Sequence, residues 1–371
     1  MDNSKKKLIL ITLAIVWGIF SLTYYLENVD WMQPIPKDVG VFEIICWISS
    51  YLAMGTNFKL APNSAPAEFG FVYVTQILYY FIFGWLVANK IFKDKAYTLN
   101  KNIKAKDFIG KVVAVTGGAS GIGYALARKF GQEGAAIALA DLDELQLKEA
   151  VEKLAQESIK AEYFICDVSK VEEIQSFADN AWKTYGHVDV IVNNAGIAFP
   201  PAPVVETNIK DVQKLFDIDF YGVWNGSKIF AQKFIEQGTP AAIYNLGSEN
   251  SFFNGFPGTA SYVAAKHAVL ALTEALREEL PDFIDVGIIC PGLVNTKLGA
   301  PELMNQGMPV DKFADIVMKQ IKNGEFYIVS HAYNAVRLED RFKSIKQAYD
   351  TYAPRYDNDI EYDIRTLLQK K

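Results

Sequence analysis

Tyr262 and Lys266 are the two residues of this sequence whose types and spacing best suit acid–base chemistry. Residues four apart on a helix share one face, so a helix over these positions would direct both side chains into the same cleft. A phenol with a reference pKa of about 10 is a poor base at neutral pH, and a nearby ammonium group favours its phenolate form. The pair could therefore move a proton to or from a substrate oxygen, with Tyr262 as the base or the acid.

A glycine-rich turn, Thr116 to Gly123, has the composition of a phosphate-binding loop. Gly117 permits a tight turn, Gly121 lets the backbone approach a pyrophosphate, and Gly123 lets the following helix pack closely. The N-terminus of that helix would then face the anion. Glycine-rich turns are also ordinary connections between a strand and a helix, so the turn alone does not decide for a cofactor.

Asp141 ends the next apolar run, where a carboxylate can accept hydrogen bonds from ribose hydroxyls and would repel a 2′-phosphate. This favours NAD(H) over NADP(H), as does the lack of Arg or Lys at Ala119 and Ser120. An NADP(H)-linked carbonyl reductase is the alternative for the cofactor. The alternative for Asp141 itself is that it caps the following helix, a role that Asp143 could fill instead.

The elements that must position these residues are short apolar runs that alternate with helical stretches from residue 111 onward. This alternation predicts an α/β fold of the Rossmann type, a doubly wound parallel sheet with helices on both faces. The first helix is expected over 122–132. The predicted strands are 112–116, 135–141, 161–165, 188–192, 241–246, 284–289 and an edge strand at 326–329.

Together with further motifs in a fixed order, these features resemble the short-chain dehydrogenase/reductase family over Gly110 to Val329. Asp167-Val168 is similar to the family's adenine contact, and Asn193 to Gly196 to the motif that ends its fourth strand. Tyr262 to Lys266 has the family's Tyr-x-x-x-Lys spacing, and Pro291 to Thr296 is similar to its nicotinamide-side loop. The order and intervals of the set make the resemblance specific.

The resemblance implies an NAD(H)-dependent alcohol dehydrogenase or carbonyl reductase, in which Tyr262 moves the proton while the nicotinamide moves a hydride. It also implies that Lys266 holds the nicotinamide ribose. The residues that it implies for cofactor binding are Gly117, Ser120, Gly121, Ile122, Gly123, Asp141, Asp167, Val168, Asn194, Ala195, Gly196, Tyr262, Lys266, Pro291, Gly292, Val294 and Thr296.

Ser248 is the serine that the resemblance assigns to the substrate oxygen, because Asn245 to Ser248 is similar to the family's Asn-x-Ser-Ser strand end. The family's commonest interval from this serine to the tyrosine is one residue shorter than the interval found here. We therefore expect a one-residue insertion within Phe252 to Phe256. Ser251 is the alternative serine.

Asp219 stands where the family usually carries an Asn that supports a water-mediated proton path to the lysine. A carboxylate accepts hydrogen bonds but cannot donate them as an amide does, and it adds negative charge near Lys266. We therefore expect an altered pH dependence or weakened turnover, and the relay role of Asp219 stays open. A membrane-bound nucleotide-binding scaffold that has lost turnover is the alternative function.

Three segments after strand ends, 197–205, 252–258 and 293–308, are expected to select the substrate, because open parallel sheets bind ligands at their carboxyl edge. A hydrophobic secondary alcohol or ketone, such as a steroid, retinoid or long-chain lipid, would suit their few charges. The alternative is that their apolar side chains pack the loops or a dimer interface. These side chains are Phe199, Phe252, Phe253, Phe256, Leu298, Leu303 and Met304.

Residues 1–96 predict a helical membrane anchor that precedes the catalytic domain. The uncharged runs at 8–26 and 69–89 are each close to the roughly 20 residues that cross a bilayer as a helix. Lysines precede the first run and follow the second, so the positive-inside bias places the catalytic domain on the cytoplasmic side. A signal peptide at the first run and a buried helical subdomain are the alternatives.

The remaining boundaries and partners follow from charge and composition. A basic connector at 97–109 leads into a domain at 110–331, and a helical tail at 332–371 could cover the cleft, mediate a homo-oligomer or lie on the membrane. We expect a homo-oligomer that meets membrane lipid and a small hydrophobic substrate. The formal net charge of -6 argues against nucleic acid as a partner. The three cysteines are too scattered to indicate a disulfide framework or a metal site.

Overall fold

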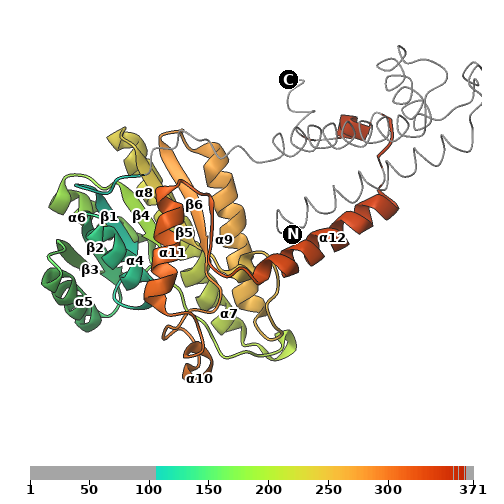
Figure 1. Ribbon diagram of the computed structural model, residues 1–371, viewed down its shortest axis with the longest axis horizontal. Coiled ribbons are helices and arrows are strands. Elements are labelled where there is room, and N and C mark those ends of the chain that lie inside the picture. The colour runs from blue at the N-terminus through green and yellow to red at the C-terminus, as the bar shows by residue number, and fades with distance from the viewer. Residues whose placement is uncertain (1–105, 354, 358, 363, 365–371) are drawn as a thin grey trace, which may run out of the picture. The chain divides into compact units, whose positions relative to one another are not determined.

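The computed structural model describes residues 106–353, 355–357, 359–362 and 364 (Figure 1). The predicted membrane spans at 8–26 and 69–89 lie outside these residues. Within the described part of the chain, no helix combines the length and the apolar character needed to cross a membrane.

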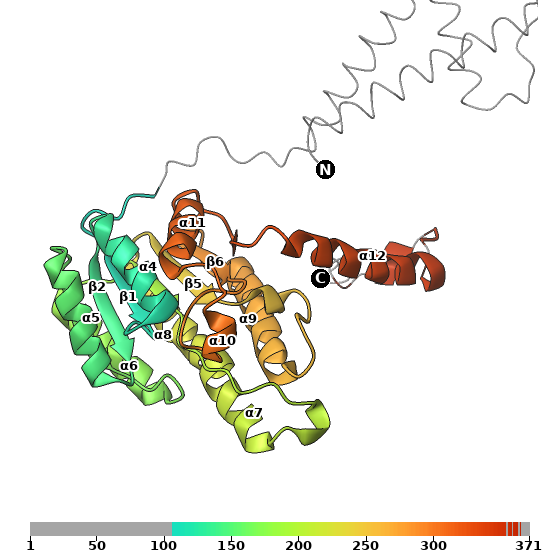
Figure 2. The same ribbon diagram turned by 60° about the horizontal axis from the view of Figure 1, so that its bottom comes forward.

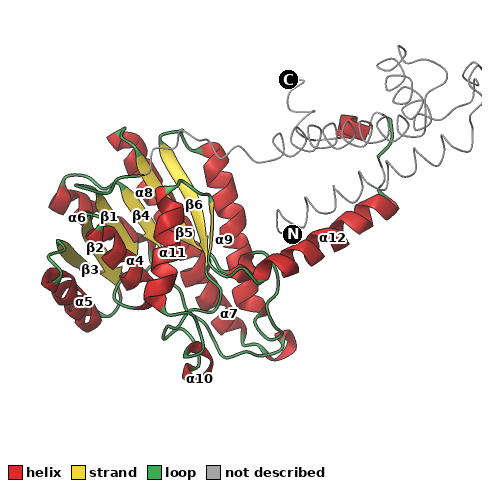
Figure 3. Ribbon diagram, viewed as in Figure 1, coloured by secondary structure: helices red, strands yellow, loops and turns green. Residues whose placement is uncertain are grey.

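Seven parallel strands form one sheet in the order β3-β2-β1-β4-β5-β6-β7 (Figure 3). The predicted Rossmann-type sheet is confirmed, and each predicted strand lies within two residues of its observed bounds. The central strands are apolar runs because both faces of the sheet are covered, as the fully buried β1 illustrates, whereas the edge strand β3 contains the exposed Glu162. The strands are β1 Val112–Thr116, β2 Ala136–Asp141, β3 Ala161–Ile165, β4 Val190–Asn193, β5 Ala241–Leu246, β6 Ile284–Cys290 and β7 Tyr327–Val329.

Helices cover the sheet on both faces, and each layer has its own hydrophobic core. On one face, α4 (Gly121–Gln132), α5 (Glu144–Gln156) and α11 (Val310–Lys322) bury residues such as Phe130, Leu154 and Phe313. Helices α4 and α11 lie side by side there (Figure 2). The opposite face carries α6 (Val171–Tyr185), α8 (Val223–Gln237) and α9 (Ala260–Glu279), which bury residues such as Phe177, Phe230 and Val269.

The strand order reverses at β1, which lies between β2 and β4. Connections from neighbouring strands leave toward opposite faces at such a point, and their divergence opens a crevice at the carboxyl edge of the sheet. The glycine-rich turn after β1, Asp141 at the end of β2 and Asn194 after β4 all lie at this edge. The fold therefore brings the predicted cofactor residues together.

Shorter elements surround the carboxyl edge. The segment before α8 consists of η1 (Val204–Glu206), α7 (Ile209–Phe216) and a π-helix, η2 (Asp217–Gly222). A 3₁₀ helix, η3 (Glu249–Ser251), follows β5, and α10 (Pro301–Met304) follows β6. The tail contains α12 (Asn334–Tyr352) and η4 (Asp359–Tyr362), and every side chain of α12 from Glu339 onward is exposed.

Lys106 fastens the start of the described chain to the opposite, amino edge of the sheet. Its Nζ donates a hydrogen bond of 2.8 Å to the buried Tyr244 Oη and lies 2.8 Å from Asp285 Oδ2, while its backbone N donates to Lys322 O. Burial opposes the charge on Lys106, but Tyr244 and Asp285 outweigh burial and raise its pKa. Phe108 packs edge-on against Phe130. The last residues of the predicted connector thus belong to the packed domain.

Candidate active site

Tyr262 and Lys266 both lie on α9 and line one pocket at the carboxyl edge of the sheet. Lys266 Nζ is 5.6 Å from the centre of the Tyr262 ring. Tyr262 is half-buried, whereas only 2% of Lys266 is exposed. Helical spacing therefore places the phenol toward the opening and the ammonium group behind it.

The charge of Lys266 is held by two acceptors. Its Nζ donates a hydrogen bond of 3.1 Å to Leu246 O and lies 3.2 Å from Asp219 Oδ2. Burial by itself would lower the pKa of Lys266, but Asp219, assisted by Tyr262, raises it above its ordinary value. An ammonium group buried this deeply would be costly without such a partner.

Asp219 is placed by the π-helix η2, and only 1% of it is exposed. Its Oδ1 accepts a hydrogen bond of 2.8 Å from the Ile197 backbone N–H, and its Oδ2 faces Lys266 without the alignment of a hydrogen bond. Burial raises the pKa of Asp219, while Lys266 and the Ile197 N–H act to lower it. A buried ion pair thus occupies the position where the sequence departs from the family's asparagine.

The pKa of Tyr262 is raised above the ordinary phenol value. Burial is the main cause, and Asp219 acts in the same direction. Lys266 and the Ser248 side chain act to lower the Tyr262 pKa, as the sequence predicts for the lysine, but burial outweighs them. Burial therefore disfavours the phenolate of Tyr262, and Lys266 and Ser248 oppose this effect.

Ser248 begins the 3₁₀ helix η3 directly after β5, and 5% of it is exposed. Its Oγ accepts a hydrogen bond of 3.1 Å from the Asn250 N–H, which leaves its own O–H to donate elsewhere. Ser251 Oγ instead accepts a hydrogen bond from the Ser248 N–H and is fully buried. The structure therefore favours Ser248 over Ser251, although Ser248 lies beside the pocket lining rather than in it.

The glycine-rich turn forms a cradle at the N-terminus of α4. Gly117 and Gly121 have φ angles of +62° and +56°, which side chains disfavour. A Cβ on Gly123 would lie 2.2 Å from Gly117 O and 2.5 Å from Asn194 Nδ2, so the helix packs against the turn itself. Within the described residues, no side chain caps the first turn of α4. Its free backbone N–H groups suit a phosphate.

Asp141 lies in the same pocket and is fixed by backbone donors. Its Oδ2 accepts from the Ala119 N–H at 3.1 Å and its Oδ1 from the Leu142 N–H at 2.8 Å. The helix-cap alternative does not apply, because Asp143 caps α5 by accepting from the Gln146 N–H. Backbone donors thus hold the Asp141 carboxylate in the pocket lining, where it can accept further hydrogen bonds.

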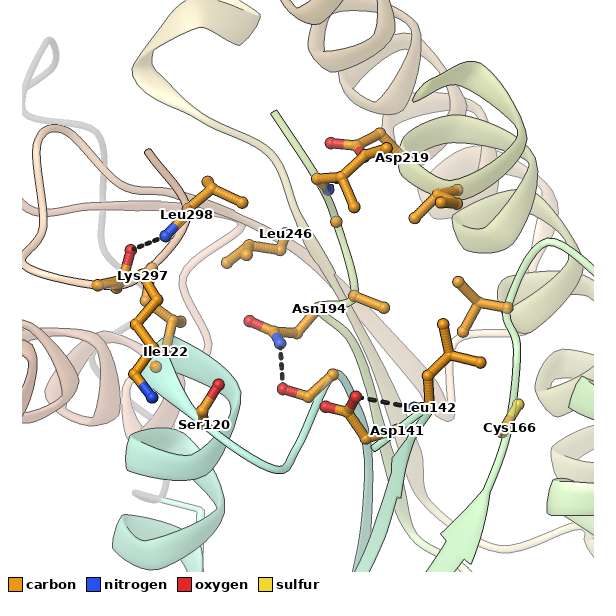
Figure 4. Close-up of a pocket in the computed structure, with 18 of the residues that line it drawn as sticks. Ser120, Ile122, Asp141, Leu142, Cys166, Asn194, Asp219, Leu246, Lys297 and Leu298 are labelled. Carbon is orange, nitrogen blue, oxygen red and sulfur yellow. Dashed lines mark hydrogen bonds between the residues drawn. The ribbon is translucent and has the colours of Figure 1, made fainter. Parts of the chain in front are cut away.

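The pocket has a volume of about 320 Å³ and runs from Asp141 and Ser120 at one end to Asp219 and Leu246 at the other (Figure 4). A pocket that joins a phosphate cradle, a ribose carboxylate and a proton-transferring pair fits a nicotinamide dinucleotide. The predicted residues that line it are Gly117, Ser120, Gly121, Ile122, Asp141, Asp167, Val168, Asn194, Ala195, Gly196, Asp219, Tyr262, Lys266 and Thr296.

Four other residues predicted to bind the cofactor do not line the pocket. Gly123 lies in helix α4, and Pro291, Gly292 and Val294 belong to the nicotinamide-side loop. His331 holds this loop, because its Nδ1 accepts a hydrogen bond of 3.2 Å from the Gly292 N–H. Leu298, which the sequence assigns to a substrate segment, also lines the pocket, and the remaining lining residues are Leu142, Cys166, Ile197, Ile218, Leu246 and Lys297. Most of them directly adjoin a predicted residue, and this adjacency is the signal that could have found them.

The expected substrate segments divide into packed and exposed side chains. Phe252 packs against Tyr327, and Phe253 is buried beneath the Arg337 guanidinium, as the packing alternative proposed. Phe256, Leu298 and Leu303 remain exposed. The apolar surface open to a substrate is therefore smaller than the sequence suggested.

Comparison with known proteins supplies independent evidence on ancestry. The family model for short chain dehydrogenase matches residues 111–306. The 1-deoxy-11-beta-hydroxypentalenate dehydrogenase of Streptomyces avermitilis is 33% identical over 62% of this chain and 88% of its own. Zerumbone synthase of Zingiber zerumbet is 36% identical over 54% of this chain and 75% of its own. The crystal structure of a short chain dehydrogenase/reductase from Burkholderia phymatum in complex with NAD superposes with a TM-score of 0.62 at 26% identity, covering 65% of this chain and 96% of that one.

Proposed function

The chain belongs to the short-chain dehydrogenase family, and from this premise we propose that it interconverts a hydrophobic secondary alcohol and its ketone with NAD(H). Alcohol and carbonyl oxidoreduction itself is supported by the related dehydrogenases. The observation that carries the finer proposal is one pocket that holds Tyr262 and Lys266 at one end and Asp141 at the other.

The proposed oxidation removes one proton and one hydride from the alcohol and delivers them to two different acceptors. When bound, the nicotinamide supplies the hydride acceptor or donor. In alcohol oxidation, Tyr262 Oη takes the hydroxyl proton as the carbon loses its hydride, and the C–O bond becomes a carbonyl. Ser248 donates a hydrogen bond to the substrate oxygen, and Lys266 lowers the cost of the phenolate. The same groups return the proton in carbonyl reduction.

Tyr262→Phe tests the proton-transfer role. Turnover should fall by about 10²- to 10⁴-fold, because general acid–base catalysis contributes a factor of this size. NADH binding, followed by the quenching of protein fluorescence, should stay within about twofold since the ring remains in place. Tyr221→Phe, a change at an exposed tyrosine outside the pocket, is the control. Undiminished turnover by Tyr262→Phe would refute the proposed role.

The proposed substrate class rests on the exposed Leu298 in the pocket lining, on the exposed Phe256 and Leu303 of the predicted substrate segments, and on the names of two relatives. Those names refer to 1-deoxy-11-beta-hydroxypentalenate and to zerumbone. A panel of borneol, decan-2-ol, testosterone and propan-2-ol, assayed with NAD in detergent, tests the proposal. We expect the larger alcohols to be preferred. Turnover of propan-2-ol alone would overturn the substrate class, and NADH binding without any turnover would favour the scaffold alternative that Asp219 keeps open.

We also propose that residues 1–96 anchor the protein in a membrane with its catalytic domain on the cytoplasmic side. The support is the pair of uncharged apolar runs at 8–26 and 69–89 and the lysines that flank them. The full-length protein should remain in the membrane pellet after carbonate extraction, and protease added to sealed vesicles of known orientation should reach the domain only from the cytoplasmic face. Release by carbonate would contradict this anchoring.

A further inference from the structure

The first two turns of α12 lie against the loop that follows η3, which we call the substrate loop, residues 252–258 (Figure 1). Arg337 Nη1 donates a hydrogen bond of 3.0 Å to Gly255 O, and Arg341 Nη1 donates to Phe252 O. Residues four apart on a helix share a face, so both guanidinium groups reach the loop from the same side. Two carbonyl groups of the substrate loop thus depend on the tail for their hydrogen bonds.

Each arginine makes a second contact that fixes its position. The Arg337 guanidinium lies over the Phe253 ring, 5.6 Å from its centre, which is the geometry of a cation–π contact. Arg341 Nη1 is 2.8 Å from His267 Nε2 on α9. Since arginine can only donate, Nε2 accepts, and His267 Nδ1 donates to Val263 O at 2.9 Å. Arg341 therefore ties the substrate loop to the helix that carries Tyr262 and Lys266.

A third contact joins the same face of α12 to η3, the short helix that follows β5. Asn334 Nδ2 donates to Glu249 Oε2, and the Glu249 backbone N–H donates 2.7 Å to Pro291 O in the nicotinamide-side loop. Four other hydrogen bonds hold the loop: the Phe252 N–H donates to Glu249 O, the Gly255 N–H to Asn250 Oδ1, Thr259 Oγ1 to Phe256 O, and the Ala202 N–H to Gly258 O. Within the described residues, the tail thus supplies the two arginine hydrogen bonds beside these four.

We propose that Arg337 and Arg341 are positioning residues that hold the substrate loop in the shape that receives the substrate. The proposal rests on the oxidoreductase function proposed above. Phe256 is 45% exposed and directly follows Gly255, whose carbonyl group Arg337 holds. The family model ends at residue 306, so this support comes from a part of the chain beyond the matched region.

Hydrogen exchange of the full-length protein tests the positioning without any substrate. In the double variant Arg337→Ala/Arg341→Ala, amides of residues 252–258 should exchange at least about tenfold faster, since a factor of ten corresponds to one lost contact of about 1.4 kcal/mol. Lys343→Ala, a change on the same helix at an exposed lysine, should leave these amides unchanged. Unchanged exchange in strands β4 and β5 shows that the variant is folded. Equal exchange of the loop in native and double-variant protein would overturn the proposal.

Kinetics with the best alcohol of the panel then separate positioning from a general structural role. The double variant should raise KM about tenfold while kcat and NADH affinity stay within about threefold, because the proton-transferring residues are intact. Arg341→Lys, which keeps the charge but loses the planar fork, should give an intermediate KM. Faster loop exchange with an unchanged KM would also overturn the proposal. If the native protein oxidised none of the alcohols, the proposed function would fail, whereas loop exchange would still decide whether the arginines hold the loop.

Discussion

Asp219 acts on both members of the proposed proton-transferring pair. Its carboxylate raises the pKa of both Lys266 and Tyr262, so it stabilises the ammonium group and at the same time disfavours the phenolate. Asp219→Asn removes that charge but keeps an oxygen for the Ile197 N–H. The pKa of Tyr262 should fall, because one of the causes that raise it is gone.

The pH dependence of alcohol oxidation should therefore move toward lower pH in Asp219→Asn. The rate rises with pH as Tyr262 loses its proton, so a lower Tyr262 pKa moves this rise toward lower pH. Profiles of kcat/KM against pH for native and variant protein measure the displacement. Asp217→Asn, a change at an exposed residue of the same π-helix, is the matched control. Superimposable profiles would show that Asp219 does not influence the titrating group.

Asp141 should decide the choice between the two nicotinamide cofactors. Asp141→Asn keeps the shape and an acceptor oxygen but removes the charge that would repel a 2′-phosphate. The ratio of Kd for NADPH to Kd for NADH, from fluorescence titrations, should fall about tenfold, which corresponds to about 1.4 kcal/mol. Asp143→Asn should leave the ratio unchanged, because Asn also caps helices well. A native protein that already preferred NADPH would contradict the assignment of Asp141.

At the scale of elements, the seven strands could be predicted because each is an apolar run bounded by turn residues. The π-helix η2 could not, since its sequence, Asp217 to Gly222, has no pattern that separates it from an α-helix. The sequence identified Asp219 as unusual but did not reveal its direct contact with Lys266. The resemblance of Asn245 to Ser248 to the family's strand end predicts Ser248, but the sequence does not show the hydrogen bonds that distinguish it from Ser251.

Gly123→Ala and Gly121→Ala should separate close packing from backbone strain at the start of α4. An added Cβ at Gly123 meets the Gly117 carbonyl and Asn194, so unfolding in urea should show a loss of about 3 kcal/mol, the upper end for overpacking. At Gly121 the nearest atom is Thr296 Cγ2 at 3.6 Å, so only the strain of a positive φ, about 1–2 kcal/mol, is expected. A smaller loss for Gly123→Ala than for Gly121→Ala would contradict this packing account.

At the scale of the whole molecule, the lysines of residues 97–109 predict a basic connector, because lysine side chains usually remain in water. The structure instead buries much of Lys106 against Tyr244, a pairing between positions 138 residues apart. Sequence spacing carries no signal for such a contact. The same limit applies to the tail, whose contacts with the substrate loop join residues more than 80 positions apart.

Lys106→Met should destabilise the domain by about 1–3 kcal/mol, because Tyr244 Oη is left buried without its donor. The raised pKa of Lys106 means that its contribution is complete below the unfolded-state pKa and is lost as pH rises through the folded-state value. Urea unfolding at neutral pH and above pH 10 measures both effects. Lys312→Met, at an exposed lysine, should change stability by less than about 0.5 kcal/mol. Equal stability of Lys106→Met and native protein would contradict the role of this contact.

The attachment of Lys106 at the amino edge of the sheet also decides how the protein can be handled on a solid support. The pocket opens at the carboxyl edge, so a sensor chip or bead coupled through the chain before Lys106 connects to the far side of the domain. Coupling through the C-terminus instead attaches the support to the tail that contains α12, and the first turns of α12 hold the substrate loop. A coupling point next to Lys106 is therefore the one at which immobilised protein should retain the cofactor and substrate binding that it has in solution.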